Sequence, residues 1–299
     1  MSILIDENTT FIIQGITGRE AVNMTRECLD YGSKLIGGVT PGRGGRDVYG
    51  VPVFDTVKEA MSEERVDGSV ITVPAPFVRD AAFEAIENGI KLLVIVTERT
   101  PRYEVAQVLE LARERGTRVI GPNCLGIISP GKSKMGGIGG PAANTQQAYK
   151  PGRIGVMSRS GGMTTEISNS LTAAGFGEST AVSIGGDPLI GSTYAELMPL
   201  FEADPETDAI VIYTEPGGPM DAQLALWVKE NNSRLPIIAF MAGKFMDKMP
   251  GMRFGHAGTI VEGKSDTAAE KLERLREAGI SVAEEISQIP DLVRERLGE

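Results

Sequence analysis

The sequence predicts an α/β protein with two parallel-sheet domains in tandem. Short apolar runs recur along the chain, and each is followed by a segment in which hydrophobic residues have helical spacing. This alternation is typical of parallel sheets that helices cover on both faces. A passage rich in Gly, Pro, Asn and Ser interrupts it once. We therefore predict a first domain at 1–128, an interdomain connection at 129–152 and a second domain at 153–299.

The expected strands follow in chain order. In the first domain they are the runs at 9–15, 33–39, 68–74, 91–97 and 117–123. In the second domain they are the runs at 152–158, 178–186, 208–214, 235–241 and 279–285. Residues 267–280 have an amphipathic pattern that stops at Gly279, which predicts a packed surface helix. Ligands of such folds bind beyond the carboxyl ends of the strands, so residues just after each run are candidate site residues.

Composition narrows the class of protein. The 299 residues are 41% hydrophobic, with 30 Lys and Arg against 40 Asp and Glu, and the formal net charge is -10. Nucleic acids and anionic membranes repel such a chain, so we expect neither as a partner. No apolar run is long enough for a membrane span, and the N-terminus lacks the pattern of a signal peptide. These features predict a cytoplasmic protein.

Residues that bind zinc are scarce. The chain has two cysteines, Cys28 and Cys124, and one histidine, His256. These are too few for a zinc cluster, and reduced thiols suit a cytosolic protein. We expect no metal site in this chain and interpret Cys124 as a small core residue.

Two turns of the first domain suit a phosphate ligand. The first strand runs into Gly15-Ile16-Thr17-Gly18, and glycines at a strand-to-helix turn let backbone N–H groups approach a phosphate. The spacing differs from the G-x-G-x-x-G of NAD-binding proteins. Arg43 and Arg46 follow the second strand, where an NAD site has an acidic residue. They indicate a phosphate such as the 3′-phosphate of coenzyme A or the 2′-phosphate of NADP. The alternative is plain βα turns whose glycines serve geometry only.

Three turns of the second domain share one expected sheet edge. The segment 160–162 opens a helix, and the N–H groups there favour an anion. The alternative role of Ser160 is an ordinary N-cap. The turns at 184–188 and 214–218 close the next two strands, whose carboxyl ends lie side by side in a parallel sheet. His256 follows the next strand and a loop, so we expect it to reach the same edge.

A single imidazole at this edge suggests phosphoryl transfer. One ring nitrogen of His256 would carry the phosphoryl group, while Glu215 would hold the other nitrogen and fix the tautomer. A rival interpretation is a hydrolase with Ser160 as nucleophile, because serine, acid and histidine have the chain order of an α/β-hydrolase triad. Its acid would be Asp187 or Glu215. The hydrolase motif G-x-S-x-G requires glycine where this chain has Ser158.

Over nearly its whole length the sequence resembles the α subunits of succinyl-CoA synthetases, which are succinate–CoA ligases. The motifs that carry the resemblance include QGITG, YGSKLIGGVTPGRGG, IGPNC, VMSRSG, SIGGDPLIGS and GHAG. The resemblance implies a Rossmann-like CoA-binding domain followed by a flavodoxin-like domain that carries a phosphohistidine. It also implies a second chain, an ATP-grasp β subunit that binds ATP or GTP with Mg²⁺, and this chain has no Walker A loop of its own.

The resemblance assigns a reaction and its residues. The nucleotide would phosphorylate His256, the phosphoryl group would pass to a carboxylic acid, and CoA would displace phosphate to give acyl-CoA. Glu215 would contact the histidine. The phosphate would be held by Ser160, Gly161 and Gly162. The residues implied for CoA are Thr17, Gly18, Arg19, Glu20, Val39, Pro41, Arg43, Val73, Pro74, Thr97, Glu98 and Asn123.

The acid is expected to be a dicarboxylate or a tricarboxylate. Succinate comes first because that activity dominates the family. The segments Ser160-Gly161-Gly162-Met163 and Phe254-Gly255-His256 look more like ATP-citrate lyase and citryl-CoA synthetase, so citrate and malate are alternatives. The family usually has threonine at the position of Gly162, and its absence here would leave room for a bulkier acid. A regulatory CoA-binding protein without catalysis is a further alternative.

Overall fold

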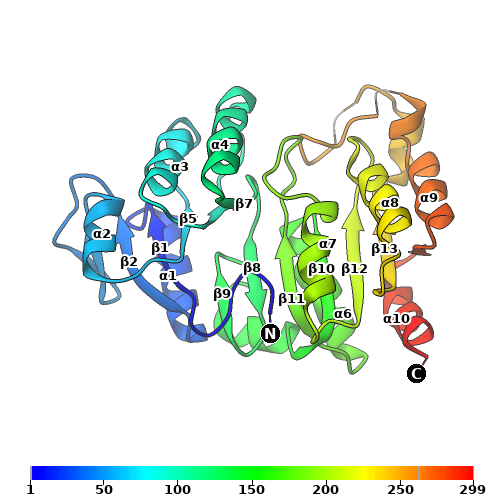
Figure 1. The fold of residues 1–299 in the computed structure, drawn as a ribbon, viewed down its shortest axis with the longest axis horizontal. Coiled ribbons are helices and arrows are strands. Elements are labelled where there is room, and N and C mark those ends of the chain that lie inside the picture. Colours follow the sequence, from blue (N-terminus) through cyan, green and yellow to red (C-terminus); the bar gives the residue numbers. More distant parts are fainter. Residues whose placement is uncertain (1, 253, 262, 299) are drawn as a thin grey trace.

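The computed structural model describes residues 2–252, 254–261 and 263–298 as two α/β domains side by side (Figure 1). The strands of the first sheet are β1 (Thr10–Gln14), β2 (Lys34–Val39), β3 (Asp47–Val48), β4 (Val51–Phe54), β5 (Gly68–Ile71), β6 (Leu92–Ile95) and β7 (Arg118–Ile120). Their spatial order is β3-β4-β2-β1-β5-β6-β7. All are parallel to their neighbours except β3, which runs antiparallel to β4. The six parallel strands have the order of a Rossmann fold.

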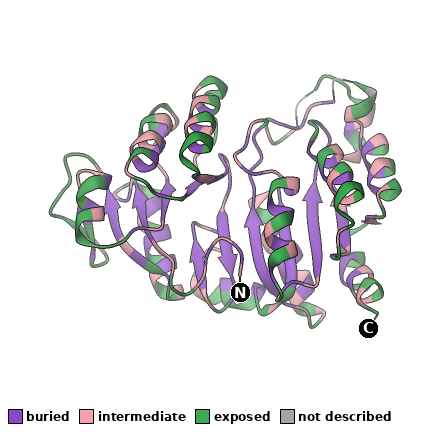
Figure 2. Cartoon of the chain, in the orientation of Figure 1, coloured by how far each residue is buried: buried purple, intermediate pink, exposed green. Residues whose placement is uncertain are grey.

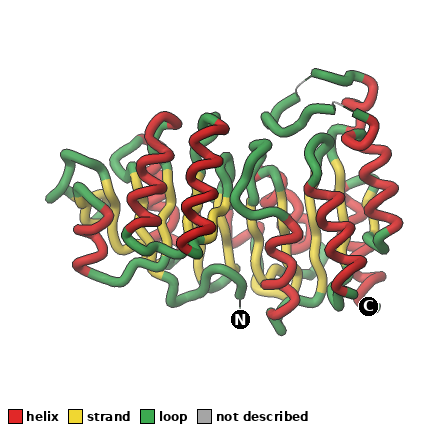
Figure 3. Tube along the Cα trace, turned by 45° about the horizontal axis from the view of Figure 1, so that its top comes forward, coloured by secondary structure: helices red, strands yellow, loops and turns green. Residues whose placement is uncertain are grey.

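Helices cover both faces of the first sheet. They are α1 (Arg19–Tyr31), α2 (Val57–Glu63), α3 (Val78–Glu87) and α4 (Arg102–Arg115), and the short 3₁₀ helix η1 (Ala75–Phe77) precedes α3. Successive side chains of β1 point to opposite faces of the sheet. Phe11 and Ile13 pack on the face that α1 covers, and Ile12 packs on the face that α2, α3 and α4 cover. Figure 3 shows strands between helices in both domains.

The second sheet has seven strands as well. They are β8 (Gly126–Ser129), β9 (Ser133–Met135), β10 (Pro151–Ser158), β11 (Glu178–Ser183), β12 (Ala209–Thr214), β13 (Ile237–Met241) and β14 (Ser281–Ala283). Their order is β14-β13-β12-β10-β11-β8-β9. The five parallel strands β10 to β14 have the flavodoxin-like order, and β8 and β9 extend the sheet in antiparallel fashion. The predicted α/β class, Rossmann-like and then flavodoxin-like, is confirmed.

The helices of the second domain divide between the two faces of its sheet. They are α5 (Ala142–Ala148), α6 (Gly161–Ala173), α7 (Tyr194–Ala203), α8 (Met220–Asn231), α9 (Ala268–Glu277) and α10 (Ile289–Leu297), with short 3₁₀ helices η2 (Lys244–Lys248), η3 (Lys264–Asp266) and η4 (Ile286–Gln288). One face packs against α5, α6 and α10. The other packs against α7, α8 and α9. The helix predicted within 267–280 is α9, and Gly279 follows its end with φ +80°.

The segment expected as an interdomain connection, 129–152, is packed structure. It contains β9, α5 and the first residues of β10, and the second sheet already begins with β8. One of its glycines allows close backbone approach: a Cβ on Gly136, where φ is +111°, would lie 2.6 Å from the Leu125 carbonyl oxygen. The turn-rich composition therefore reflects a short antiparallel hairpin. In the first domain, the short strands β3 and β4 were also not predicted.

The two domains share one hydrophobic core. A continuous cluster of buried residues runs from the α1 face of the first sheet to the α7 and α8 face of the second, and Figure 2 shows the strands of both sheets buried. Backbone bonds join the strand ends: Gly121 N–H donates to Ile184 O at 3.2 Å, and Gly186 N–H donates to Asn123 O at 3.0 Å. The ends of β7 and β11 are thus held together.

Glu178 makes the stability of the second domain depend on pH. Its side chain is 1% exposed, and burial is the main cause that raises its pKa from 4.5 to about 8. Between these values the folded chain keeps a proton that the unfolded chain releases. The free energy of unfolding is therefore expected to fall as pH rises from about 4.5 to about 8, and then to level off. Denaturant unfolding measured at several pH values across this window should show that the free energy of unfolding falls less steeply with pH in Glu178→Gln than in the wild type. An unchanged slope in that variant, with exposed Glu114→Gln as control, would contradict the prediction.

Candidate active site

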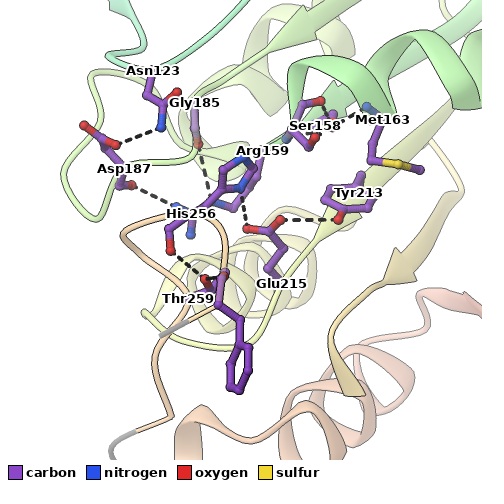
Figure 4. Close-up of polar contacts among 12 residues, drawn as sticks. Asn123, Ser158, Arg159, Met163, Gly185, Asp187, Tyr213, Glu215, His256 and Thr259 are labelled. Carbon is purple, nitrogen blue, oxygen red and sulfur yellow. Dashed lines mark hydrogen bonds and ion pairs between the residues drawn. The ribbon is translucent and has the colours of Figure 1, made fainter. Parts of the chain in front are cut away.

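The second-domain site lies where three strand ends meet the loop that carries His256. Gly186, just after β11, forms the surface beneath the imidazole, because a Cβ built there would lie 2.6 Å from carbon atoms of the His256 ring. Figure 4 shows the ring between this turn and Glu215, which follows β12. The predicted reach of the single histidine to this sheet edge is seen in the structure.

Glu215 and His256 are in direct contact. The distance from His256 Nδ1 to Glu215 Oε2 is 2.8 Å, and their side chains are 26% and 10% exposed, respectively. The Tyr213 hydroxyl donates to Glu215 Oε1 at 3.3 Å, and burial raises the pKa of Tyr213, so this hydroxyl stays protonated. A carboxylate beside Nδ1 favours the tautomer with its proton on Nδ1. Nε2 then keeps its lone pair for a reaction.

The segment 160–162 begins α6. Ser160 is the N-cap, and its Oγ accepts a hydrogen bond from Met163 N–H at 3.4 Å. Gly161 packs on Leu125, whereas a Cβ on Gly162 would have no atom within 4 Å. Within the described residues no hydrogen bond joins Ser160 to His256, so the nucleophile–base contact of a hydrolase triad is not formed. The N–H groups of Gly161 and Gly162, which precede Met163 in the first turn of α6, have no acceptor inside the helix and remain available to an anion.

Asn123 and Asp187 connect this site to the first domain. The Asn123 side chain donates to Asp187 Oδ1 at 3.0 Å. Burial is the main cause that raises the pKa of Asp187, and the charge of Glu98 raises it further. Asn123 was expected at the CoA site of the first domain. In the structure it also contacts the turn of the second domain that lies beneath His256. Arg159 also joins this network, and sequence reasoning did not single it out.

A cavity of about 740 Å³ opens at the carboxyl ends of β1, β2 and β5. The predicted CoA residues that line it are Thr17, Gly18, Arg19, Glu20, Val39, Pro41, Val73 and Pro74. The other lining residues, which lie outside the predicted CoA set, are Gln14, Gly15, Thr40, Thr72, Phe77, Asp80, Ala81 and Glu84, with Ala21 at the start of α1. Phe77 is the last residue of η1, in the segment that connects β5 to α3. A cavity beside a glycine-rich strand-to-helix turn suits an extended phosphate-bearing ligand.

Four predicted CoA residues lie outside this lining. Thr97 and Asn123 are joined to the cavity residue Val73 by hydrogen bonds: Thr97 Oγ1 donates to Val73 O at 2.7 Å, and Asn123 N–H donates to Thr97 O at 3.0 Å. Glu98 pairs with its neighbour Arg99 at 3.5 Å on the surface. The Arg43 side chain is exposed, and its backbone N–H donates to Asp55 at 3.0 Å.

Neither membrane spans nor metal clusters are found in the described part of the chain. No helix within these ranges is long and apolar enough to cross a membrane. Nor does any group of three or more His, Cys, Asp or Glu side chains among the described residues have an arrangement suited to a metal ion.

Comparison with known proteins supports both halves of this description. The family model of the CoA binding domain matches residues 6–99, and that of CoA-ligase matches residues 157–281. The fold and the two sites thus define an acid–thiol ligase that uses CoA. The chain is 44% identical to the succinate–CoA ligase [ADP-forming] subunit alpha 1 of Archaeoglobus fulgidus, over 98% of both chains. It belongs to the family of succinate–CoA ligase α subunits.

Other relatives differ in the acid. The chain is 45% identical to the malate–CoA ligase subunit alpha of Methylorubrum extorquens, covering 95% of this chain and 94% of that one. Among solved structures, ATP citrate lyase from Methanothrix soehngenii in complex with citrate and coenzyme A matches with a TM-score of 0.90 and 25% identity. That match covers 98% of this chain and 51% of the other, so this chain spans about half the length of the lyase.

Phe77 is expected to contribute to CoA affinity through the adenine ring. Its side chain is 60% exposed at the cavity. We expect the thiol of CoA to approach the second domain beyond β7, which would place the adenine end toward β1, β2 and β5. Loss of one aromatic stacking contact weakens binding by about 1 to 3 kcal/mol. Calorimetry should show that Phe77→Ala has a lower affinity for CoA than the wild type and the same affinity for 4′-phosphopantetheine, which lacks adenine.

Tyr103→Ala is the matched control for Phe77, because Tyr103 is 75% exposed on α4 and does not line the cavity. It should bind both ligands as the wild type does. An equal loss of CoA and phosphopantetheine affinity in Phe77→Ala would show that the residue does not recognise adenine.

Arg43 is expected to recognise the 3′-phosphate of CoA. Arg43 is exposed and follows β2, two residues after Pro41 of the cavity lining. Arg43→Glu replaces an attractive charge with a repulsive one, so CoA affinity should fall by roughly 1 to 3 kcal/mol. Dephospho-CoA, which lacks that phosphate, should bind the variant and the wild type alike. Unchanged CoA affinity would remove Arg43 from the site.

Proposed function

We propose that His256 carries a phosphoryl group from a nucleoside triphosphate to a carboxylic acid, and that CoA then displaces phosphate from the acyl phosphate. The single observation behind this proposal is the 2.8 Å contact between His256 Nδ1 and Glu215 Oε2, in a turn seated on Gly186. Such a contact supports Nε2 as the nucleophile, because Nδ1 is occupied by the carboxylate.

The chemistry balances in three displacements. Nε2 attacks the terminal phosphorus, the bond from that phosphorus to the bridging oxygen breaks, and a nucleoside diphosphate leaves. The positive charge that develops on the ring is stabilised by Glu215. A substrate carboxylate oxygen then attacks the phosphorus, which frees the imidazole and forms an acyl phosphate. Finally the CoA sulfur, having lost its proton, attacks the acyl carbon, and inorganic phosphate leaves with the bonding pair.

The start of α6 is the second part of this proposal. Its free N–H groups and positive dipole end would hold the phosphoryl oxygens, with Gly161 and Gly162 leaving the backbone accessible. We further propose that the nucleotide, with Mg²⁺, binds to an ATP-grasp β subunit. The names of the relatives as α subunits support a separate partner chain.

Succinate is the proposed acid, in line with the succinate–CoA ligase relatives. Malate is the second candidate, supported by a relative of 45% identity that acts on malate. The empty space beside Gly162 also supports a larger acid, because a side chain there would enter it. Citrate rests on a likeness to a chain of which ours spans about half.

The test uses the complex of this chain with its co-purified partner. Incubation with γ-labelled ATP or GTP should place on this chain a phosphate that is labile in acid and stable in base, as expected of a phosphoramidate bond. Succinate and CoA together should discharge it. Acid-dependent ADP release, measured with succinate, malate and citrate in parallel, then identifies the substrate. A base-labile, acid-stable label would instead indicate a serine ester, and no label in the active complex would reject the relay.

A second measurement requires no partner. Because the chain has one histidine, the small phosphoryl donor phosphoramidate can modify a single imidazole. ³¹P NMR distinguishes the two ring isomers. The contact at Nδ1 predicts the Nε2 isomer in the folded protein, and a mixture in urea. A dominant Nδ1 isomer in the folded protein would contradict the proposed role of Glu215.

A further inference from the structure

Arg159 lies at the centre of the turns that surround His256. It follows β10, immediately before the N-cap of α6, and only 2% of the residue is exposed. Its backbone N–H donates to Tyr213 O at 3.3 Å, which joins it to the strand that leads to Glu215. Figure 4 shows its side chain beside the imidazole.

The guanidinium binds the turn beneath the ring. Nη2 donates to Asp187 O at 2.8 Å, and Nε donates to Gly185 O at 3.3 Å. These two carbonyls belong to the residues on either side of Gly186, on which the ring lies. Two donors of one planar group therefore fix the peptide planes that shape the surface under His256.

The same guanidinium also packs against the turn that carries the histidine. A Cβ on Gly258 would lie 2.6 Å from Arg159 Nη2, so only glycine fits here without a shift. Gly258 N–H approaches Gly186 O at 3.4 Å. One side chain thus spans the turn below the ring and the turn that bears it.

The charge of Arg159 is also suited to the site. Among the described residues its guanidinium forms no ion pair, since its hydrogen-bond acceptors are backbone carbonyls. A buried cation of this kind favours an anionic group nearby. Lysine would keep the charge, but its single ammonium cannot reproduce the planar pair of donors.

We propose that Arg159 is a positioning residue for the phosphoryl relay: it locks the turns at 185–187 and 256–258 together and so aims Nε2 of His256. This inference rests on the proposed function of His256. A small displacement of a nucleophile lowers its rate by about 100-fold. In the complex with the partner, Arg159→Met should therefore be phosphorylated by ATP about 100-fold more slowly, with the half-saturating ATP concentration unchanged. Arg159→Lys should fall in between.

The matched control is Arg234→Met. The Arg234 guanidinium also donates to backbone carbonyls, those of Phe201, Glu202, Asp204 and Thr207, and it pairs with Glu202 Oε2 at 3.4 Å. It lies before β13, at the opposite ends of the strands of the same sheet. This variant should lose stability and keep the wild-type rate per folded molecule. Imidazole NMR signals, which the single histidine makes unambiguous, should change in the Arg159 variants and not in Arg234→Met.

The outcomes separate the two proposals. Absence of label in the wild type defeats the function proposed for His256. A labelled wild type together with wild-type rates per folded molecule in both Arg159 variants defeats the role of Arg159 alone. If Arg159→Met does not fold, the phosphorylation rate of Arg159→Lys, which keeps the charge, tests the inference instead. Equal losses in the Arg159 variants and in Arg234→Met would mean a general effect on stability, and would also overturn the inference.

Discussion

The His256→Asn variant is expected to lose phosphorylation and acyl-CoA formation completely. Asparagine is close in size and can approach Glu215, but its amide cannot accept a phosphoryl group. The chain has no other histidine to take over. CoA affinity should remain, because the cavity at β1, β2 and β5 does not include residue 256. Labelling of the complex with γ-labelled ATP measures the loss of phosphorylation, and calorimetry measures the affinity for CoA.

Glu215→Gln provides the graded counterpart of this variant. Glutamine keeps the shape and a possible bond to Nδ1 but removes the charge that stabilises the ring as it becomes positive. Loss of such a carboxylate slows related chemistry on the order of 10² to 10⁴-fold. Residual acyl-CoA formation in His256→Asn above that of Glu215→Gln would refute the relay, because the phosphoryl carrier cannot matter less than the group that supports it.

The parts of the fold that sequence predicts best are the long parallel strands. Each lies buried between two layers of helices, so its residues are apolar almost throughout, as in β6 and β12. The strands β3, β8 and β9 were not predicted from an apolar run. All three are short; β3 and β9 are edge strands, and β8 lies beside β9. The sequence of β9 is Ser-Lys-Met although all three residues are buried. Lys134 is buried there because its ammonium donates to Gly140 O at 2.5 Å, and no hydrophobic pattern signals such a contact.

The site was predictable to the extent that it depends on strand ends. Parallel topology places Glu215, Ser160 and the loop of His256 at one edge, and the contact between Glu215 and His256 is found there. The side-chain direction of Arg159 was not predictable, since an arginine beside an N-cap commonly points to solvent. Its inward direction depends on the carbonyls of Gly185 and Asp187, which approach it only after the sheet has formed.

Lys271→Met is expected to lower the free energy of unfolding by about 3 to 5 kcal/mol, because it leaves a buried carboxylate without its cation. Lys271 on α9 and Asp221 on α8 are 1% and 2% exposed at their side chains, and Nζ lies 2.6 Å from Asp221 Oδ2. Denaturant unfolding measures the loss. A variant within about 1 kcal/mol of the wild type would mean that water or another group replaces the ammonium.

The double variant Lys271→Met/Asp221→Leu separates stability from the geometry of the site. Removing both charges should recover much of the lost stability, as for other buried ion pairs that are replaced by apolar residues. It does not restore the donor that Lys271 Nζ supplies to Gly217 O at 2.7 Å and to Glu215 O at 3.3 Å. The turn that carries Glu215 would therefore stay loose, and phosphorylation of His256 should remain slow in a protein that is stable again. Recovery of the rate together with stability would place Lys271 in the core alone, whereas recovery of stability without the rate would connect this buried lysine to the imidazole through the backbone of residues 215–217.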